Sequence, residues 1–335
     1  MKIALLGYGY WGPNIARNIQ ASERAELYAI CDRSEDMLRK ARAVYGDQVR
    51  YLTDYRALLD DPNVEGVALA LRYDVSYPIA KEILCAGKHL FAEKPLAISS
   101  ERALELGRLS EENGVTLHVD HILIYHPIIQ YIKGMVDAGE LGDILYFDFT
   151  RVNLGPHIKN DINAMWDLAV HDLAVLDHLC GGQTPRTVQS LGMRHYGPTE
   201  ELTYLLLGYD KMVAFLKSSW VSPLKERTMI VCGTKKMVVF DDVKLDEKLM
   251  IYDKGIELPD DFTEYGRYEA KVRMGDMYAP YVPYHDALRA SLEHFIDCAE
   301  TSAPSRSGYP QAARVIRILE AADEQMRMRR QGPTV

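Results

Sequence analysis

The first fourteen residues, MKIALLGYGYWGPN (1–14), decide the fold of the chain. Residues 2–6 form an apolar run of strand length, and Gly7, Gly9 and Gly12 follow it in G-x-G-x-x-G spacing. A strand, a glycine turn and a helix in this order are typical of dinucleotide-binding domains. The first glycine permits a tight turn, the second lets the backbone approach a pyrophosphate, and the third lets the helix pack closely on the strand. The pyrophosphate is then expected on the free N–H groups at the start of that helix.

A second apolar run, residues 25–31, ends in Asp32, at the distance of about 20 residues at which such domains carry an acid. A carboxylate there accepts hydrogen bonds from the adenosine ribose hydroxyls and repels a 2′-phosphate. NAD is therefore favoured over NADP, although the neighbouring Arg33 could tolerate a phosphate. Tyr10 and Trp11, within the glycine turn, could stack near this cofactor or pack on the helix.

Strand and helix patterns alternate through the first part of the chain. The run at 66–71 is apolar throughout, as in a strand that is buried on both faces of a parallel sheet. This order predicts a doubly wound parallel sheet that binds its ligand at the carboxyl ends of the strands. The expected strands are residues 2–6, 25–31, 49–52, 66–71, 89–92 and 115–119. The further cofactor-binding candidates that follow strand ends are Leu71, Arg72, Glu93, Lys94 and His121.

The pattern changes near residue 143 to a series of strand-like segments with short connectors, which predicts a large, mostly antiparallel sheet. We therefore expect a Rossmann domain over 1–122 and an α+β domain for substrate binding and oligomerisation over 123–335. Residues 254–283 are rich in Asp, Gly, Pro and Tyr and suggest an irregular excursion. A helix is expected at 162–179, and the expected strands are 143–152, 187–196, 201–209, 212–221, 228–231 and 237–241. Two amphipathic helices, one around Leu292 and one around Ile318, are expected to close the chain.

Composition narrows the function classes. A chain of 335 residues exceeds what one core usually serves, and a net charge of −9 argues against nucleic acid or an anionic membrane as partner. The five cysteines are scattered, and no apolar run reaches the ~18 residues of a membrane span, so a cytoplasmic location is expected. His118, His121 and His126 are close in sequence, but without a nearby Cys or Glu cluster we expect no metal site.

Two further stretches resemble a known family. Residues 86–97, AGKHLFAEKPLA, resemble the "aGkHv…EKPla" signature of the Gfo/Idh/MocA oxidoreductases, the family of glucose-fructose oxidoreductase and inositol dehydrogenase. Residues 166–172, WDLAVHD, resemble its D-x-G-x-H-x-x-D helix, with Ala169 at the usual glycine. With the glycine turn, these motifs cover essentially the whole chain in the family's order. The family commonly has "TPxxxH" where residues 72–77 read RYDVSY, so the surroundings of the cofactor are expected to differ there.

Oxidation of a secondary alcohol with NAD requires a proton acceptor and a donor that stabilises the developing alkoxide. The Lys94 ammonium can hydrogen-bond the reacting oxygen, and His171 has an intrinsic pKa near neutrality. Asp167 precedes His171 by four residues, so a helix brings both side chains to one face. The resemblance implies that Lys94 and His171 are the catalytic pair, converging on one carbinol, and that Asp167 positions a sugar hydroxyl or the imidazole. It also implies a cis peptide bond between Lys94 and Pro95.

Residues 151–156, RVNLGP, resemble family members that act on nucleotide-linked amino sugars, including dehydrogenases of the 3-hydroxyl of UDP-N-acetylglucosamine. Asn153 would then bind the substrate together with Lys94, Asp167 and His171. A dehydrogenase or reductase of a free cyclitol, a sugar or an aminoglycoside-type product is the alternative. A non-catalytic, dinucleotide-binding regulator is a third hypothesis. A homodimer or homotetramer is expected, because the extended second sheet would leave a face that needs burial.

Overall fold

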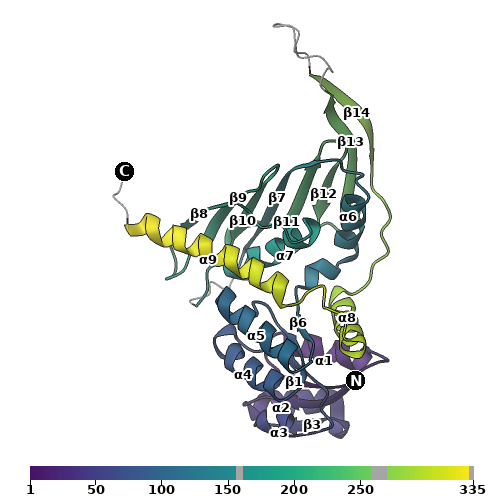
Figure 1. The fold of residues 1–335 in the computed structure, drawn as a ribbon, viewed down its shortest axis with the longest axis vertical. Coiled ribbons are helices and arrows are strands. Elements are labelled where there is room, and N and C mark those ends of the chain that lie inside the picture. The colour runs from purple at the N-terminus through teal and green to yellow at the C-terminus, as the bar shows by residue number, and fades with distance from the viewer. Residues whose placement is uncertain (156–160, 258–269, 332–335) are drawn as a thin grey trace. The chain divides into compact units, whose positions relative to one another are not determined.

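A six-stranded parallel sheet in the order β3-β2-β1-β4-β5-β6 forms the centre of the N-terminal part (Figure 1). The strand order reverses between β1 and β4, which is the switch point where such sheets bind ligands. The predicted doubly wound sheet is thereby confirmed. The strands are β1 (Lys2–Leu6), β2 (Glu26–Cys31), β3 (Arg50–Leu52), β4 (Gly66–Leu69), β5 (His89–Ala92) and β6 (Leu117–Val119).

Helices follow these strands in alternation, and α1, α2, α4 and α5 contact the sheet. Proline in a sequence commonly marks the first turn of a helix, but α4 begins at Tyr73 and contains Pro78 in its interior. The helices are α1 (Gly12–Ala21), α2 (Glu35–Tyr45), α3 (Arg56–Leu59), α4 (Tyr73–Cys85) and α5 (Ser100–Glu112).

The computed structural model describes residues 1–155, 161–257 and 270–331, and the chain divides into two compact units. The first comprises Met1–His126 and His285–Arg317, and the second Pro127–Tyr284 and Ile318–Val335. Residues 285–317 therefore lie with the Rossmann unit, whereas the sequence suggested one domain from residue 123 onward.

Helix α8 (Ala287–Thr301) explains this division. The Asp286 carboxylate caps it by accepting hydrogen bonds from the Leu288 and Arg289 amides. Phe295, on its apolar face, is fully buried in the core that contains β1, and its ring lies 5.7 Å from that of Phe91 on β5. The amphipathic pattern predicted the buried face of this helix, but it carries no information on which core the helix joins.

The second unit contains an eight-stranded sheet in the order β14-β13-β12-β11-β7-β10-β9-β8, in which the β7–β10 pair is parallel and the other pairs are antiparallel. This confirms the predicted large, mostly antiparallel sheet. The unit's helices are α6 (Pro127–Asp137), α7 (Val170–Leu179) and the part of α9 (Tyr309–Gln331) from Ile318 onward. The strands are β7 (Ile144–Leu154), β8 (Thr187–Met193), β9 (Leu202–Gly208), β10 (Val213–Ser219), β11 (Val221–Gly233), β12 (Met237–Asp241), β13 (Leu249–Glu257) and β14 (Lys271–Tyr278).

The expectation of an irregular segment at 254–283 is wrong for residues 254–257 and 271–278, which form strands. β13 and β14 pair in antiparallel fashion at one edge of the sheet (Figure 1), and Arg273 forms an ion pair with Asp253 across them. Most of β14 is exposed, so its sequence lacks the alternation of apolar and polar residues that marks a half-buried strand. Residues 258–269 lie outside the described residues.

Candidate functional site

The glycine turn has the geometry that its sequence predicts. Gly7 has φ +99°, and a Cβ added there would lie 2.5 Å from the Ala70 carbonyl oxygen. A Cβ on Gly12 would lie 2.2 Å from the Gly7 carbonyl oxygen, so both positions require glycine. A Cβ on Gly9 would meet no atom within 4 Å, which leaves open space above the turn. Helix α1 starts directly after the turn without a side-chain cap, as an anion-binding helix end does.

Asp32 follows β2, and its carboxylate is held by two backbone donors. Oδ2 accepts the Tyr8 N–H at 2.7 Å, and Oδ1 accepts the Ser34 N–H at 2.8 Å. These bonds fix the carboxylate at the end of the strand. Each oxygen keeps a further lone pair, so the side chain can still accept hydrogen bonds from a diol.

A cavity of about 400 Å³ brings four of the predicted cofactor residues together, namely Gly7, Asp32, Arg33 and Leu71. Its position at the carboxyl ends of the strands, with a glycine turn and a carboxylate in its wall, suits the adenosine half of a dinucleotide. Three polar lining residues escaped the sequence analysis, which are Thr53, Tyr55 and Asp74. Thr53 follows β3 directly, so the strand-end rule could have found it. The predicted residues outside this lining are Gly9, Tyr10, Trp11, Gly12, Arg72, Glu93, Lys94 and His121.

Three of the residues outside the lining are close in sequence to lining residues, and each has a different degree of contact with the rest of the chain. Tyr10 is 94% exposed, so its ring packs on nothing in the described chain. Trp11 is partly buried, and its Nε1 has no hydrogen-bond partner among the described residues. Arg72 precedes α4, and its Nε lies 3.2 Å from the Asp74 carboxylate.

The ends of β5 and β6 bring a group of ionisable side chains together. The Lys94–Pro95 peptide bond is cis, as the resemblance implied. Burial raises the pKa of Glu93 well above its usual value and that of Asp120 to about 7, and the Lys94 ammonium opposes both changes. Burial and the same ammonium lower the pKa of His121 to about 3, so its imidazole is neutral. Neither ring nitrogen of His121 has a hydrogen-bond partner in the described part of the chain.

His118 is a core residue with both ring nitrogens occupied. Its Nδ1 lies 3.0 Å from Ser305 Oγ and its Nε2 lies 2.9 Å from Ser291 Oγ. Its ring stacks on Phe91 at 5.0 Å between centroids. Within residues 1–155, 161–257 and 270–331, no three His, Cys, Asp or Glu side chains gather in a way that could hold a metal ion.

The Asp167–His171 pair lies in a helix whose first part is irregular. Residues Met165–Ala169 form a π-helical turn and α7 follows from Val170, where the sequence predicted regular helix. Asp167 is in the π turn and His171 is in the first turn of α7. The π turn is anchored by Trp166, whose Nε1 donates a hydrogen bond of 2.6 Å to Asp323 on α9. Such turns occur frequently at functional sites.

Strand β7 contacts the same helix through a buried ion pair. Arg151 Nε and Nη2 donate to the Asp172 carboxylate at 2.7 to 3.1 Å, and the two side chains are 12% and 5% exposed. Side chains two residues apart on a strand share a face, so Asn153 points to the same side of β7 as Arg151. Asp167 and His171 thus lie on successive turns at the start of α7, and Asn153 lies two residues beyond the Arg151 that holds α7. The adjoining Pro156 lies outside the described residues.

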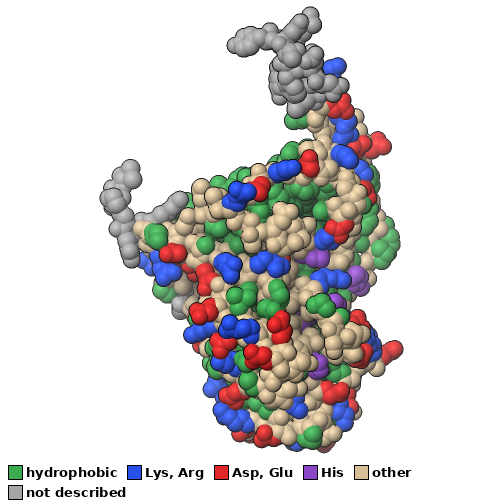
Figure 2. All heavy atoms as spheres, in the orientation of Figure 1, with side chains coloured by type: hydrophobic (Ala, Val, Ile, Leu, Met, Phe, Trp, Pro, Cys, Tyr) green, Lys and Arg blue, Asp and Glu red, His purple; other side chains and the backbone are tan. Residues whose placement is uncertain are grey.

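The surface gives no sign of a basic binding face in the view of Figure 2, where acidic and basic side chains are interspersed. Among the described residues, no helix is both long enough and apolar enough to cross a bilayer.

The chain is similar to known oxidoreductases along its length. It is 24% identical over 315 residues to scyllo-inositol 2-dehydrogenase (NAD(+)) of Bacillus subtilis, covering 89% of this chain and 86% of that protein. It is 29% identical to dTDP-3,4-didehydro-2,6-dideoxy-alpha-D-glucose 3-reductase of Streptomyces violaceoruber over 52% of each chain. Its fold matches UDP-N-acetylglucosamine 3-dehydrogenase GnnA of Acidithiobacillus ferrooxidans with a TM-score of 0.80 at 23% identity, covering 97% of this chain and 98% of that one.

Two family models match most of the chain. Residues 1–121 match the model for the oxidoreductase family with an NAD-binding Rossmann fold, and residues 129–239 match the GFO/IDH/MocA C-terminal domain. These ranges include the glycine turn, Lys94 and the Asp167–His171 pair. The chain therefore belongs to the Gfo/Idh/MocA family of NAD-binding oxidoreductases, whose members include dehydrogenases acting on CH–OH groups.

Proposed function

We propose that the protein is an NAD-dependent dehydrogenase that oxidises a secondary alcohol of a sugar, at C3 of a nucleotide-linked or amino sugar. The observation that carries this proposal is the cavity that Gly7 and Asp32 line at the carboxyl ends of the strands. The substrate class draws support from two relatives whose names specify position 3 of a nucleotide-linked sugar. When bound, the nicotinamide supplies the hydride acceptor.

NAD is proposed over NADP because the Asp32 carboxylate lines the cavity with both oxygens fixed by backbone donors. A 2′-phosphate beside this carboxylate would meet like charge in a partly enclosed space. Arg33 lines the same cavity and offers partial compensation. The preference is therefore expected to follow the charge at position 32.

Lys94 is proposed to donate a hydrogen bond to the substrate oxygen and to stabilise negative charge on it as the C–H bond breaks. His171 is proposed to take the hydroxyl proton, and Asp167 to orient the imidazole or a neighbouring hydroxyl. Asn153 is proposed to bind a substrate hydroxyl, since it shares a face of β7 with Arg151, which holds α7. The same residues return the proton when the reaction runs as a reduction.

Two alternatives remain distinguishable. The inositol dehydrogenase relative favours a free cyclitol, sugar or aminoglycoside-type substrate as the second candidate. A non-catalytic regulator is disfavoured, because a sensor has no need of Lys94, Asp167 and His171 together.

The test is NADH formation from NAD with UDP-sugars, free sugars and inositols as a panel, followed by product analysis by NMR. Oxidation of a UDP-sugar at C3 supports the proposal, and turnover of inositols alone favours the second candidate. Absence of turnover with every alcohol, together with tight NADH binding, would favour the regulator. His171→Asn keeps the size of the side chain while removing the proton acceptor, and it is expected to lower kcat by about 10² to 10⁴.

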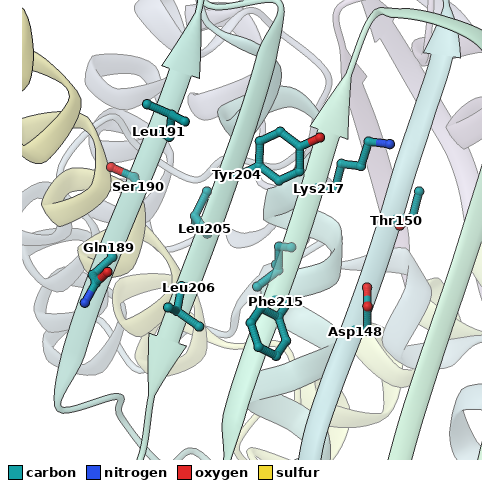
Figure 3. A pocket seen from close by; sticks show the side chains of 11 residues that line it. Asp148, Thr150, Gln189, Ser190, Leu191, Tyr204, Leu205, Leu206, Phe215 and Lys217 are labelled. Carbon is teal, nitrogen blue, oxygen red and sulfur yellow. The ribbon is translucent and has the colours of Figure 1, made fainter.

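We also propose that the protein self-associates, as a homodimer or homotetramer, through the outer face of the eight-stranded sheet. Figure 3 shows Leu191, Tyr204 and Phe215 on neighbouring strands. The three side chains line a hollow of about 410 Å³. These side chains are 49%, 44% and 42% exposed. Lys217 and Asp148 lie beside them and could form charge pairs with a second copy. A face of this kind favours burial against another protein surface.

Phe215→Asp is expected to shift the molecular mass measured by light scattering to that of the 38.0 kDa monomer. Leu245→Asp is the matched control, because Leu245 is 92% exposed and outside this face. A wild-type protein that is monomeric at micromolar concentration would refute the proposed assembly.

A cytoplasmic location is proposed on the basis of the five cysteines, all of which are free thiols in the structure.

A further inference from the structure

Two acidic side chains lie at strand ends next to Lys94, and the proposed reaction assigns a role to neither; Asp120 is buried, and Glu93 is partly buried with its Oε1 shielded from solvent. Glu93 follows β5 and Asp120 follows β6, and the two strands are paired in parallel. Asp120 is 2% exposed, and its carboxyl group is hydrogen-bonded to that of Glu93. Glu93 also accepts a hydrogen bond from the backbone N–H of Lys94.

A hydrogen bond between two carboxyl groups requires a proton, because two carboxylates are acceptors and repel each other. Burial adds to this requirement, since removing charge from water favours the neutral form. On Glu93 both effects raise the pKa, whereas on Asp120 burial raises the pKa and the hydrogen bond with Glu93 lowers it. The pair therefore retains a proton at neutral pH, and it titrates as a pair rather than as two separate acids.

The remaining oxygen of the pair is oriented by a chain of side chains within the same unit. Ser291 on α8 donates to Asp120 Oδ1 at 2.7 Å. Ser291 Oγ lies 2.9 Å from His118 Nε2, and His118 Nδ1 lies 3.0 Å from Ser305 Oγ. Because the Ser291 hydrogen goes to Asp120, His118 donates through Nε2 and accepts from Ser305 through Nδ1. These contacts hold Asp120 in one orientation toward Glu93.

The other ionisable groups around the pair supply little compensating charge. His118 and His121 are buried with lowered pKa values and are neutral, and burial raises the pKa of Tyr125, which is neutral as well. Asp286 at the start of α8 adds a weak repulsion to Asp120. Lys94 is the cation that acts on both carboxyl groups. The groups that face this cluster from β5, β6, the following 3-10 helix, α8 and the loop before α9 are Lys94, His118, His121, Tyr125, Asp286, His294 and Arg306.

We propose that Glu93 and Asp120 share a single proton, and that the one negative charge left on the pair sets how tightly Lys94 holds its own proton. Glu93 and Asp120 are positioning residues in this scheme, since they act through Lys94. The consequence for catalysis rests on the role proposed above for Lys94. The shared proton and its effect on Lys94 are properties of the protein alone and can be measured without turnover.

The experiment measures the pKa of the Lys94 amine in the full-length protein from the pH dependence of its acylation by trace acetic anhydride, read by peptide mass spectrometry. Lys94 is partly exposed and accessible to such a reagent. The proteins compared are wild type, Glu93→Gln, Asp120→Asn, the double variant, and Glu112→Gln as an exposed control on α5. Circular dichroism checks that each variant is folded.

A shared proton predicts a distinctive pattern. Each single variant keeps one carboxyl group and therefore one negative charge, so the pKa of Lys94 changes little. The double variant removes the charge and lowers the pKa of Lys94 by about one to three pH units, as expected for a nearby opposite charge. If each single variant instead lowered the pKa of Lys94 by about half of the decrease in the double variant, the two groups would be independent carboxylates, and the proposal would be overturned. An unchanged Lys94 pKa in the double variant would overturn it too.

Infrared spectroscopy of the wild type gives a second measurement that needs no stable double variant. A protonated, buried carboxyl group is expected at pH 8, and its band should disappear in Glu93→Gln and in Asp120→Asn. Asp323→Asn is the matched control, because Asp323 is a buried carboxyl group in the other unit. Absence of such a band in the wild type would contradict the shared proton, whatever the substrate of the enzyme proves to be.

Discussion

The ion pair between Arg151 and Asp172 is predicted to be a main determinant of stability in the second unit. Asp172→Ala leaves a guanidinium that is 12% exposed without its carboxylate, after three N–O contacts of 2.7 to 3.1 Å are lost. Arg227 lies close enough to act on the charge of Arg151, so the carboxylate also offsets a second cation. Removing one partner of a buried pair costs about 3 to 5 kcal/mol. At roughly 2 to 4 °C per kcal/mol, Tm of the unit should fall by roughly 6 to 20 °C.

The assay is urea unfolding, monitored through the fluorescence of Trp166 and Trp220, which both lie in the second unit. The Trp11→Phe substitution removes the third tryptophan of the chain, which lies in the other unit. Arg186→Ala is the control, because its pair with Asp210 is exposed and should contribute less than about 1 kcal/mol.

The double variant Arg151→Met/Asp172→Leu should recover most of the stability, since it leaves no unpaired buried charge. If Asp172→Ala lowered the free energy of unfolding by less than about 1 kcal/mol, the pair would contribute no more than a solvent-exposed ion pair, and the prediction would be refuted.

Three further predictions concern the Rossmann unit. Gly7→Ala should weaken NADH binding at least tenfold in a fluorescence titration, because the new Cβ would lie 2.5 Å from a carbonyl oxygen at φ +99°; Gly46→Ala, at φ +65° with nothing within 4 Å, is the control for backbone strain alone. Asp32→Ser should raise Kd for NAD by about tenfold or more through lost charge-assisted hydrogen bonds while improving Kd for NADP, and calorimetry showing an unchanged ratio would contradict it. Asp120→Asn should stabilise the fold increasingly as pH rises from about 4 to 7, because both acids ionise in the unfolded wild-type chain over that range whereas the folded Glu93–Asp120 pair keeps its one shared proton, a difference that the variant no longer has; equal effects on Tm at pH 4.5 and pH 7.5 would rule this out.

The sequence predicted the parallel sheet and the Asp32 position because both depend on local signals. Apolar runs of strand length followed by glycine specify the turn, and a carboxylate at the next strand end specifies the ribose contact. Gly7 and Asp32 accordingly line one cavity. Short connectors such as 208–210 predicted antiparallel neighbours in the second sheet, but not the insertion of β7 between β10 and β11.

Other features depend on contacts that no local pattern encodes. The π turn at Met165–Ala169 uses the same residue types as a regular helix, and the Trp166–Asp323 bond that anchors it joins segments far apart in the chain. The docking of α8 on the core of the Rossmann unit also joins segments that are far apart in the chain. The same is true of the hydrogen bond between Ser291 and Asp120. Asp120 itself follows a strand end, so the rule that identified Lys94 could have found it.

The most direct measurement is a single-turnover experiment in which NADH formation is followed after mixing enzyme and NAD with the alcohol identified by the substrate panel. Lys94→Ala is expected to bind NADH within a few-fold of the wild type and to form NADH about 10² to 10⁴ times more slowly. Arg in place of Lys94 should restore part of the rate, because it keeps the charge. NADH formation at the wild-type rate in Lys94→Ala would contradict the assignment of this side chain to the reacting oxygen.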